Sequence, residues 1–138
     1  MSGIVVDASV AMAWGFPDEG SEYAAAVLLR LERETMLVPA LFALEVANAL
    51  VMGERRKRLR QAEIQRFVEL LEGLSMVQDV QPRSVMMNAA LAIAREHGLS
   101  AYDATYLELA IRTDAPLATL DKALRAAARK TGVTVCAR

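Results

Sequence analysis

Short apolar runs recur along the chain, separated by longer segments that mix apolar and charged residues. The first run, Ile4–Val6, has no polar alternation, which is typical of a strand buried on both faces of a parallel sheet. Together with four similar runs it gives candidate strands at residues 4–6, 36–38, 76–77, 117–120 and 133–135. Strands that alternate with longer segments predict an α/β fold with a parallel sheet and helices on both faces.

The longer segments have the composition and spacing of helices. They are rich in Ala, Leu, Glu and Arg, and their apolar residues recur three and four positions apart. One such apolar stripe consists of Ile64, Phe67, Val68, Leu71 and Leu74. Proline and glycine indicate boundaries: we expect Pro82 to begin a helix that Gly98 ends, and Gly53 to follow the end of another.

Composition narrows the class of protein. The chain has 138 residues, is 54% hydrophobic, and carries a formal net charge of −1. It is too apolar and too weakly charged to be disordered, and its length fits one domain over residues 1–138. No apolar stretch approaches the roughly 20 residues of a membrane span, and residues 1–6 lack the basic start of a secretory signal. Because Cys136 is the only cysteine, we expect no internal disulfide and a cytoplasmic protein.

Three acidic residues stand where helices are expected to begin. Asp7 directly follows the first predicted strand and Asp121 follows the fourth, each ahead of a helical segment. Asp103 lies three residues after Ser100, in the Ser-x-x-acid pattern of a capping box. Since Asp and Ser are favoured at helix N-termini, each acid taken alone is explained by capping.

Glu45 has no such explanation. It is the only charged residue between Met36 and Met52, and no Lys or Arg lies within one helical turn of it. A carboxylate among apolar neighbours is costly to desolvate unless it has a partner. Glu45 therefore either points to solvent from an otherwise apolar helix or belongs to a polar site, and its own segment leaves both readings open.

All four acids can face one crevice. In a parallel α/β sheet the strand C-termini and the following helix N-termini meet at one edge, where such folds place their ligands. Carboxylates gathered there repel one another and raise each other's pKa unless a divalent cation neutralises them. Mg²⁺ and Mn²⁺ prefer oxygen ligands, whereas a chain with one His and one Cys lacks the ligands of a typical zinc site.

Four segments carry a family resemblance: residues 4–9, 44–50, 99–106 and 117–121. In this order they resemble the PIN-domain family, and specifically its VapC type of toxin ribonuclease. The resemblance covers essentially the whole chain and implies a PIN-like three-layer α/β/α sandwich around a parallel sheet of four to five strands. It implies a catalytic acidic quartet that holds one or two Mg²⁺ or Mn²⁺ ions, formed by Asp7, Glu45, Asp103 and Asp121. Ser9 and Thr119 match hydroxyl positions beside the quartet, where they would orient a carboxylate or a metal-bound water.

The activity that this resemblance implies is endonucleolytic hydrolysis of RNA by a metal-activated water, without a side-chain nucleophile. The products would carry a 5′-phosphate and a 3′-hydroxyl. The resemblance also implies a homodimer and a cognate VapB-type antitoxin that occupies the active-site groove. Outside the quartet the chain has 16 basic and 13 acidic residues, a mildly basic remainder that is compatible with an RNA partner.

A basic run lies between two predicted helices. Its members are Arg55, Arg56, Lys57, Arg58 and Arg60. The run is either a solvated face or a contact for RNA phosphates, for which a local cluster matters more than net charge. Trp14 and Phe16 are expected to pack in the core, although their closeness to Asp7 leaves base stacking open.

The main alternative is a phosphoacceptor receiver domain, which is also a parallel α/β fold with an acidic Mg²⁺ site. It fits less well, because that pattern has adjacent acids after the first strand, whereas Asp7 is followed by Ala8. Lys122 beside Asp121 is the one feature in its favour. A small phosphodonor would form an acyl phosphate on a receiver and not on a metal nuclease.

Overall fold

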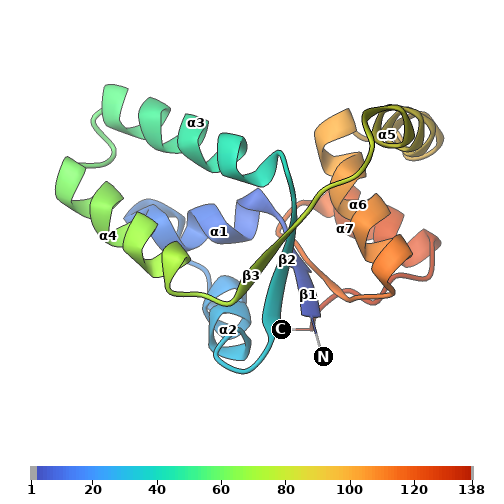
Figure 1. Ribbon diagram of the computed structural model, residues 1–138. Coiled ribbons are helices and arrows are strands. Elements are labelled where there is room, and N and C mark those ends of the chain that lie inside the picture. Colours follow the sequence, from blue (N-terminus) through green and yellow to red (C-terminus); the bar gives the residue numbers. More distant parts are fainter. Residues whose placement is uncertain (1–2, 138) are drawn as a thin grey trace.

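The computed structural model describes residues 3–137, and its centre is a parallel β-sheet (Figure 1). The strands are β1 (Gly3–Val6), β2 (Thr35–Pro39), β3 (Met76–Asp79) and β4 (Leu117–Ala118). They lie in the order β3-β2-β1-β4, and every neighbouring pair is parallel. The predicted α/β class with a parallel sheet is therefore confirmed.

Helices lie on both sides of the sheet, as Figure 1 shows. One side carries α1 (Ala8–Gly15), the short 3₁₀ turn η1 (Pro17–Glu19), α2 (Glu22–Arg30), α3 (Phe42–Arg55) and α4 (Gln61–Glu72). The other side carries α5 (Arg83–His97), α6 (Ala101–Thr113) and α7 (Lys122–Lys130). The three layers are those of the expected α/β/α sandwich.

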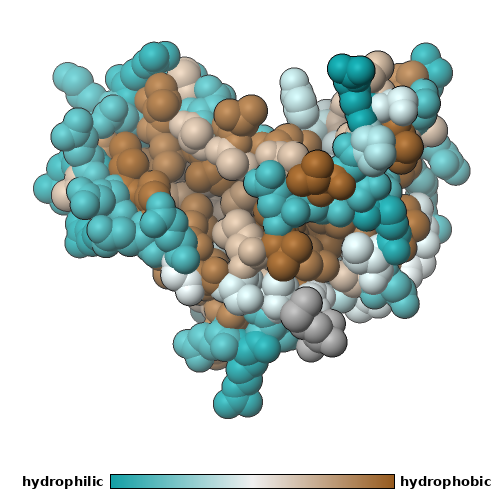
Figure 2. Space-filling model, viewed as in Figure 1, coloured by the Kyte–Doolittle hydropathy of each residue, from teal (hydrophilic) through white to brown (hydrophobic). Residues whose placement is uncertain are grey.

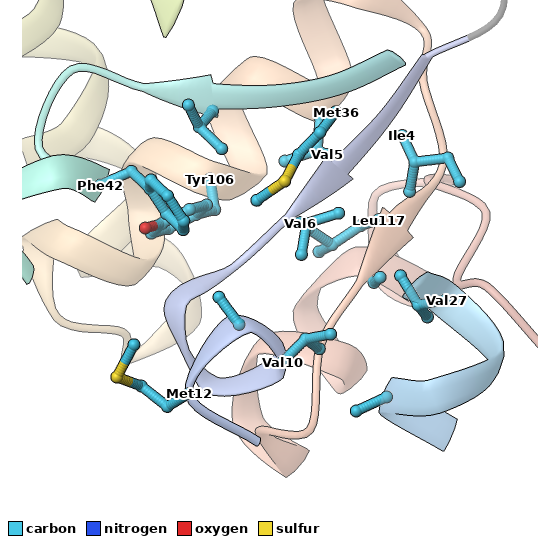
Figure 3. Packing of buried hydrophobic residues seen from close by; sticks show 14 of the residues in the cluster. Ile4, Val5, Val6, Val10, Met12, Val27, Met36, Phe42, Tyr106 and Leu117 are labelled. Atoms are coloured by element: carbon cyan, nitrogen blue, oxygen red, sulfur yellow. The ribbon is translucent and has the colours of Figure 1, made fainter. Parts of the chain in front are cut away.

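The hydrophobic core is centred on β1 (Figure 3). Ile4, Val5 and Val6 have no exposed surface, so the run without alternation is a strand covered on both faces. Burying an aliphatic side chain of this size contributes about 1.5–3 kcal/mol. Tyr106 from α6 and Phe42 from the start of α3 are both buried in this core, which therefore includes residues from both sides of the sheet.

Some boundaries differ from the sequence prediction. Residues 133–135 form no strand, and only an isolated bridge joins Val135 to Leu117. The fourth strand ends at Ala118, and the next residue, Thr119, donates its hydroxyl to the Asp7 carboxylate. The helix boundaries at Pro82 and Gly98 are confirmed, and Gly98 ends α5 in the left-handed conformation with φ 64°.

Gly53 does not end a helix as predicted. It lies inside α3 and is buried against Phe16, the residue that directly follows α1. A Cβ atom at this position would lie 2.8 Å from Cε1 of Phe16 and 3.1 Å from Cδ1 of Leu59, so glycine is required for close packing. The glycine at this position therefore reflects a close tertiary contact and not the end of a helix.

The candidate site lies at one edge of the sheet. The carboxyl ends of β1 and β4 lie side by side, and the Asp7 N–H donates to the Ala118 carbonyl at 3.2 Å. Helices α1 and α7 begin directly after these strands, while α6 packs against β1, β2 and β4. Within residues 3–137, no helix is both long and apolar enough to cross a bilayer.

Candidate active site

Asp7 joins β1 to α1 at the centre of this edge. Its side chain is only 3% exposed, and its hydrogen bonds come from neutral groups. The Ser9 hydroxyl and the Val10 N–H donate to Oδ1 at 2.6 and 3.2 Å, and the Thr119 hydroxyl donates to Oδ2 at 2.5 Å. Burial raises the pKa of the Asp7 carboxyl, although these hydrogen bonds act to lower it. The capping role is confirmed, and the carboxylate is also buried at the site.

Thr119 connects Asp7 to the start of α7. Its Oγ1 accepts from the Asp121 N–H at 3.0 Å while it donates to Asp7. The Asp121 carboxylate then caps α7 by accepting from the Leu124 N–H at 2.7 Å. Ser9 acts in parallel, because its Oγ accepts from the Leu120 N–H at 3.1 Å. The two hydroxyls thus fix the segment that follows β4 against Asp7.

Glu45 points from α3 toward α6. The phenol hydroxyl of Tyr106 donates to Glu45 Oε1 at 2.5 Å, which joins residues 61 positions apart in the chain. Burial is the main cause that raises the pKa of the half-buried Glu45 carboxyl, and the negative charges of Asp103 and Asp7 add to it. Of the two readings that the sequence left open, the structure therefore supports a polar site.

Asp103 lies in the first turn of α6. The predicted capping by Ser100 is present, because the Ser100 hydroxyl accepts from the Asp103 N–H at 3.1 Å. Burial and the negative charge of Asp121 raise the pKa of the Asp103 carboxyl. Because Asp103 and Tyr106 are three residues apart, their side chains leave α6 on one face.

The four carboxylates are close enough to affect one another's pKa values, and they lack basic partners among the described residues. None of them pairs with Lys or Arg among the described residues. Nor do any three His, Cys, Asp or Glu side chains in residues 3–137 lie close enough to hold one ion as they stand. Two of the carboxylates cap helices, and a third is held by Tyr106. The donor set consists of carboxylate oxygens, which fits Mg²⁺ or Mn²⁺, and Mg²⁺ keeps several of its waters.

The basic run lies at the α3–α4 turn, at the opposite end of α3 from Glu45 (Figure 1). Arg58 is engaged within the chain: it pairs with Asp18 at 2.9 Å and Glu19 at 2.7 Å, and its guanidinium lies 4.4 Å from the Phe16 ring centroid. Arg60 pairs with the first turn of α4. The members that are exposed and form no ion pair within the described residues are Arg55, Arg56 and Lys57.

Two aromatic residues pack as the sequence predicts, and a third has a role that the sequence did not indicate. Phe16 is buried, and the Trp14 indole donates to the Ala24 carbonyl at 2.7 Å, so both pack as expected. Tyr106 was not singled out as a polar partner, because a tyrosine in an apolar helix is usually a core residue. Its three-residue spacing from Asp103 was the available signal, but only the fold shows that α3 lies opposite.

Comparisons with known proteins agree with this fold. Residues 4–130 match the model of the PIN domain family. The chain is 36% identical to Ribonuclease VapC3 of Pyrobaculum aerophilum over 121 residues, which cover 88% of this chain and 91% of that protein. The solved structure of PAE2754 from the same organism is similar with a TM-score of 0.70 and 26% identity, over 91% of this chain and 84% of that chain.

A second solved structure, FitAcB from Neisseria gonorrhoeae, has a TM-score of 0.63 and 20% identity, over 97% of this chain and 96% of that chain. This likeness shows the shared fold. The family match spans nearly the whole chain, and the similarity to Ribonuclease VapC3 covers most of both proteins. The chain therefore belongs to the PIN domain family and, within it, to the VapC type.

Proposed function

We propose that this protein is the toxin of a toxin–antitoxin pair and acts as a metal-dependent endoribonuclease. The observation that carries the proposal is the gathering of Asp7, Glu45, Asp103 and Asp121 at one sheet edge, with no basic partner among the described residues. The similarity to Ribonuclease VapC3 supports it. We also propose that residues 1–138 act as one PIN domain.

The chemistry follows from the donor set. Mg²⁺ or Mn²⁺ held by these carboxylates would lower the pKa of a coordinated water and offset the charge that develops on the scissile phosphate. Ser9 and Thr119 keep the Asp7 carboxylate in a fixed orientation, and Tyr106 does the same for Glu45. The nucleophile would be the coordinated water and not a side chain. The reaction class is therefore hydrolysis of a phosphodiester.

The test is RNA cleavage by two carboxylate variants. Asp7→Asn and Asp103→Asn should each abolish Mg²⁺- or Mn²⁺-dependent cleavage, read by sequencing the 5′-phosphate ends of cellular RNA, while circular dichroism shows an unchanged fold. The control is Asp114→Asn at the other end of α6. Asp114 caps that helix with φ 54°, a conformation that Asn adopts readily, so this variant should cleave like the wild type. Retained cleavage in either site variant overturns the proposal.

The partners that we propose are an RNA substrate, a VapB-type antitoxin and a second copy of this chain, in the cytoplasm. An apolar groove of about 440 Å³ between α3 and α4 gives an antitoxin helix a surface on which to bury apolar side chains. Figure 2 shows apolar residues gathered over this side of the molecule. Co-expression with the antitoxin should give a complex that no longer cleaves RNA.

We also propose that the exposed part of the basic run, Arg55, Arg56 and Lys57, contacts RNA phosphates. Replacing these three residues with Gln should reduce the slope of log affinity against log salt by about 2, since each phosphate contact on a single strand contributes about 0.7. Arg58→Gln is the comparison, because its charge is already engaged by Asp18 and Glu19. An unchanged slope in the triple variant excludes the run from the RNA contact.

A further inference from the structure

A cavity of about 480 Å³ lies between the first halves of α3 and α6, beside the acidic site. Its lining residues are Leu41, Leu44, Glu45, Asn48, Ala49 and Tyr102. Figure 2 shows the molecule's outline notched between the α3 side and the α5–α6 side. Glu45 belongs both to this cavity and to the acidic site, and Tyr102 directly precedes Asp103. The cavity therefore adjoins the place where the scissile phosphate would lie.

Tyr102 distinguishes this cavity from an ordinary apolar hollow. Its side chain is 65% exposed, whereas the other tyrosines, Tyr23 and Tyr106, are buried. Tyr102 and Tyr106 are four residues apart on α6, so both stand on the face that meets α3. An aromatic ring left this open to water at a cavity rim offers a flat apolar face to a ligand, and single-stranded RNA binds proteins by stacking its bases on such rings.

Asn48 adds a polar group to the opposite wall. It follows Glu45 by three residues on α3, is exposed, and has no hydrogen-bond partner within residues 3–137. A carboxamide presents one acceptor and two donors, which is the complement of a base edge. The other walls, Leu41, Leu44 and Ala49, are apolar. The cavity thus combines a stacking ring, a hydrogen-bonding amide and apolar sides.

We propose that this cavity is a nucleobase subsite, which receives the base next to the cleaved phosphodiester of a single-stranded RNA. This inference rests on the proposed ribonuclease function and adds a source of base preference to it. The charge of the cavity agrees with a base as occupant: a base is neutral and lies beside Glu45 without repulsion, whereas a phosphate there would face the carboxylate directly. Tyr102 stacks on the base, and Asn48 reads its edge.

The first experiment measures RNA binding in EDTA, by fluorescence anisotropy of a labelled short single-stranded RNA of mixed sequence. Tyr102→Ala should weaken binding by about tenfold, the loss expected for one base–aromatic stack. Tyr102→Leu keeps the apolar bulk but lacks the flat ring, so it should be nearly as weak, and Tyr102→Phe should recover most of the affinity. Leu29→Ala is the matched control, because Leu29 on α2 is also 65% exposed and lies outside the cavity.

The second experiment measures base preference, by sequencing the 5′-phosphate ends that the protein produces from a mixed RNA pool with Mg²⁺ or Mn²⁺. Asn48→Ala should flatten the preference at one position beside the cut, and Asn48→Asp, which loses the amide donors, should shift that preference to another base. If affinity and preference are both unchanged in the Tyr102 and Asn48 variants while the wild type cleaves RNA, the subsite is overturned and the ribonuclease function stands.

The opposite failure is also distinguishable. If the wild type binds RNA without cleaving it, and Tyr102→Ala still weakens that binding, the ribonuclease function fails and the base subsite stands. If Tyr102→Leu binds RNA as well as the wild type, the cavity needs only apolar bulk, and stacking of a base is overturned. Circular dichroism of each variant excludes loss of fold as the cause.

Discussion

At the scale of single residues, the contact between Tyr106 and Glu45 carries the clearest prediction. Tyr106→Phe removes one hydroxyl and leaves the buried ring in place. We expect Mn²⁺ affinity to fall by about tenfold, as for other residues that orient a metal-binding side chain. The free energy of unfolding should fall by about 1 kcal/mol for the lost hydrogen bond. Calorimetric titration with Mn²⁺ and urea unfolding measure the two effects.

Tyr23→Phe is the control for this prediction. The Tyr23 hydroxyl is also buried, but it has no hydrogen-bond partner among the described residues. Removing it should leave Mn²⁺ affinity unchanged and should not lower stability, because a buried hydroxyl without a partner is itself unfavourable. Equal loss of Mn²⁺ affinity in both variants would show that the Tyr106 hydroxyl has no special role in holding Glu45.

At the scale of elements, the packing of α3 depends on Gly53. Gly53→Ala would place a Cβ atom 2.8 Å from the Phe16 ring. Overpacking of this kind costs about 1–3 kcal/mol, and the better helix propensity of Ala returns about 1 kcal/mol. Urea unfolding should therefore show a net loss of stability. Gly73→Ala, where the nearest atoms are 3.5 Å away and φ is −79°, should be neutral or stabilising. Equal stability of the two variants would contradict this reading of α3.

For some elements, the local sequence pattern is sufficient to predict the secondary structure. The strand β1 (Gly3–Val6) and the helix between Pro82 and Gly98 follow from apolar runs and from backbone preferences that act within a few residues. Residues 133–135 carry the same local signal as a strand, yet they have only one bridging partner at the edge of the sheet. Strand formation requires a neighbour along its length, and the local pattern contains no information about that neighbour.

At the scale of the whole molecule, the proposed metal site would couple metal binding to stability. Burial and the charge of Asp121 raise the pKa of the Asp103 carboxyl, so its charged form is unfavourable without a metal. In EDTA, Asp103→Asn should melt above the wild type. An excess of Mg²⁺ should reverse this order, because a ligand at 100 times its Kd stabilises the folded state by about 2.7 kcal/mol, which is several degrees in Tm. An equal Mg²⁺ shift in both proteins would exclude Asp103 from the ion's ligands.

The sequence by itself determined the class of fold and predicted the four acids. A buried strand, helix caps at Asp7, Ser100 and Asp121, and an isolated Glu45 are local features, because each depends on residues within a turn or two. Only the tertiary structure decided what these acids face. The Thr119–Asp7 and Tyr106–Glu45 hydrogen bonds join residues 112 and 61 positions apart. The pairing of β1 with β4, and the placement of α3 and α6 on either side of this sheet edge, bring those residues together. The physical reason is that contacts between distant residues depend on how the elements pack, which no short segment of the chain specifies.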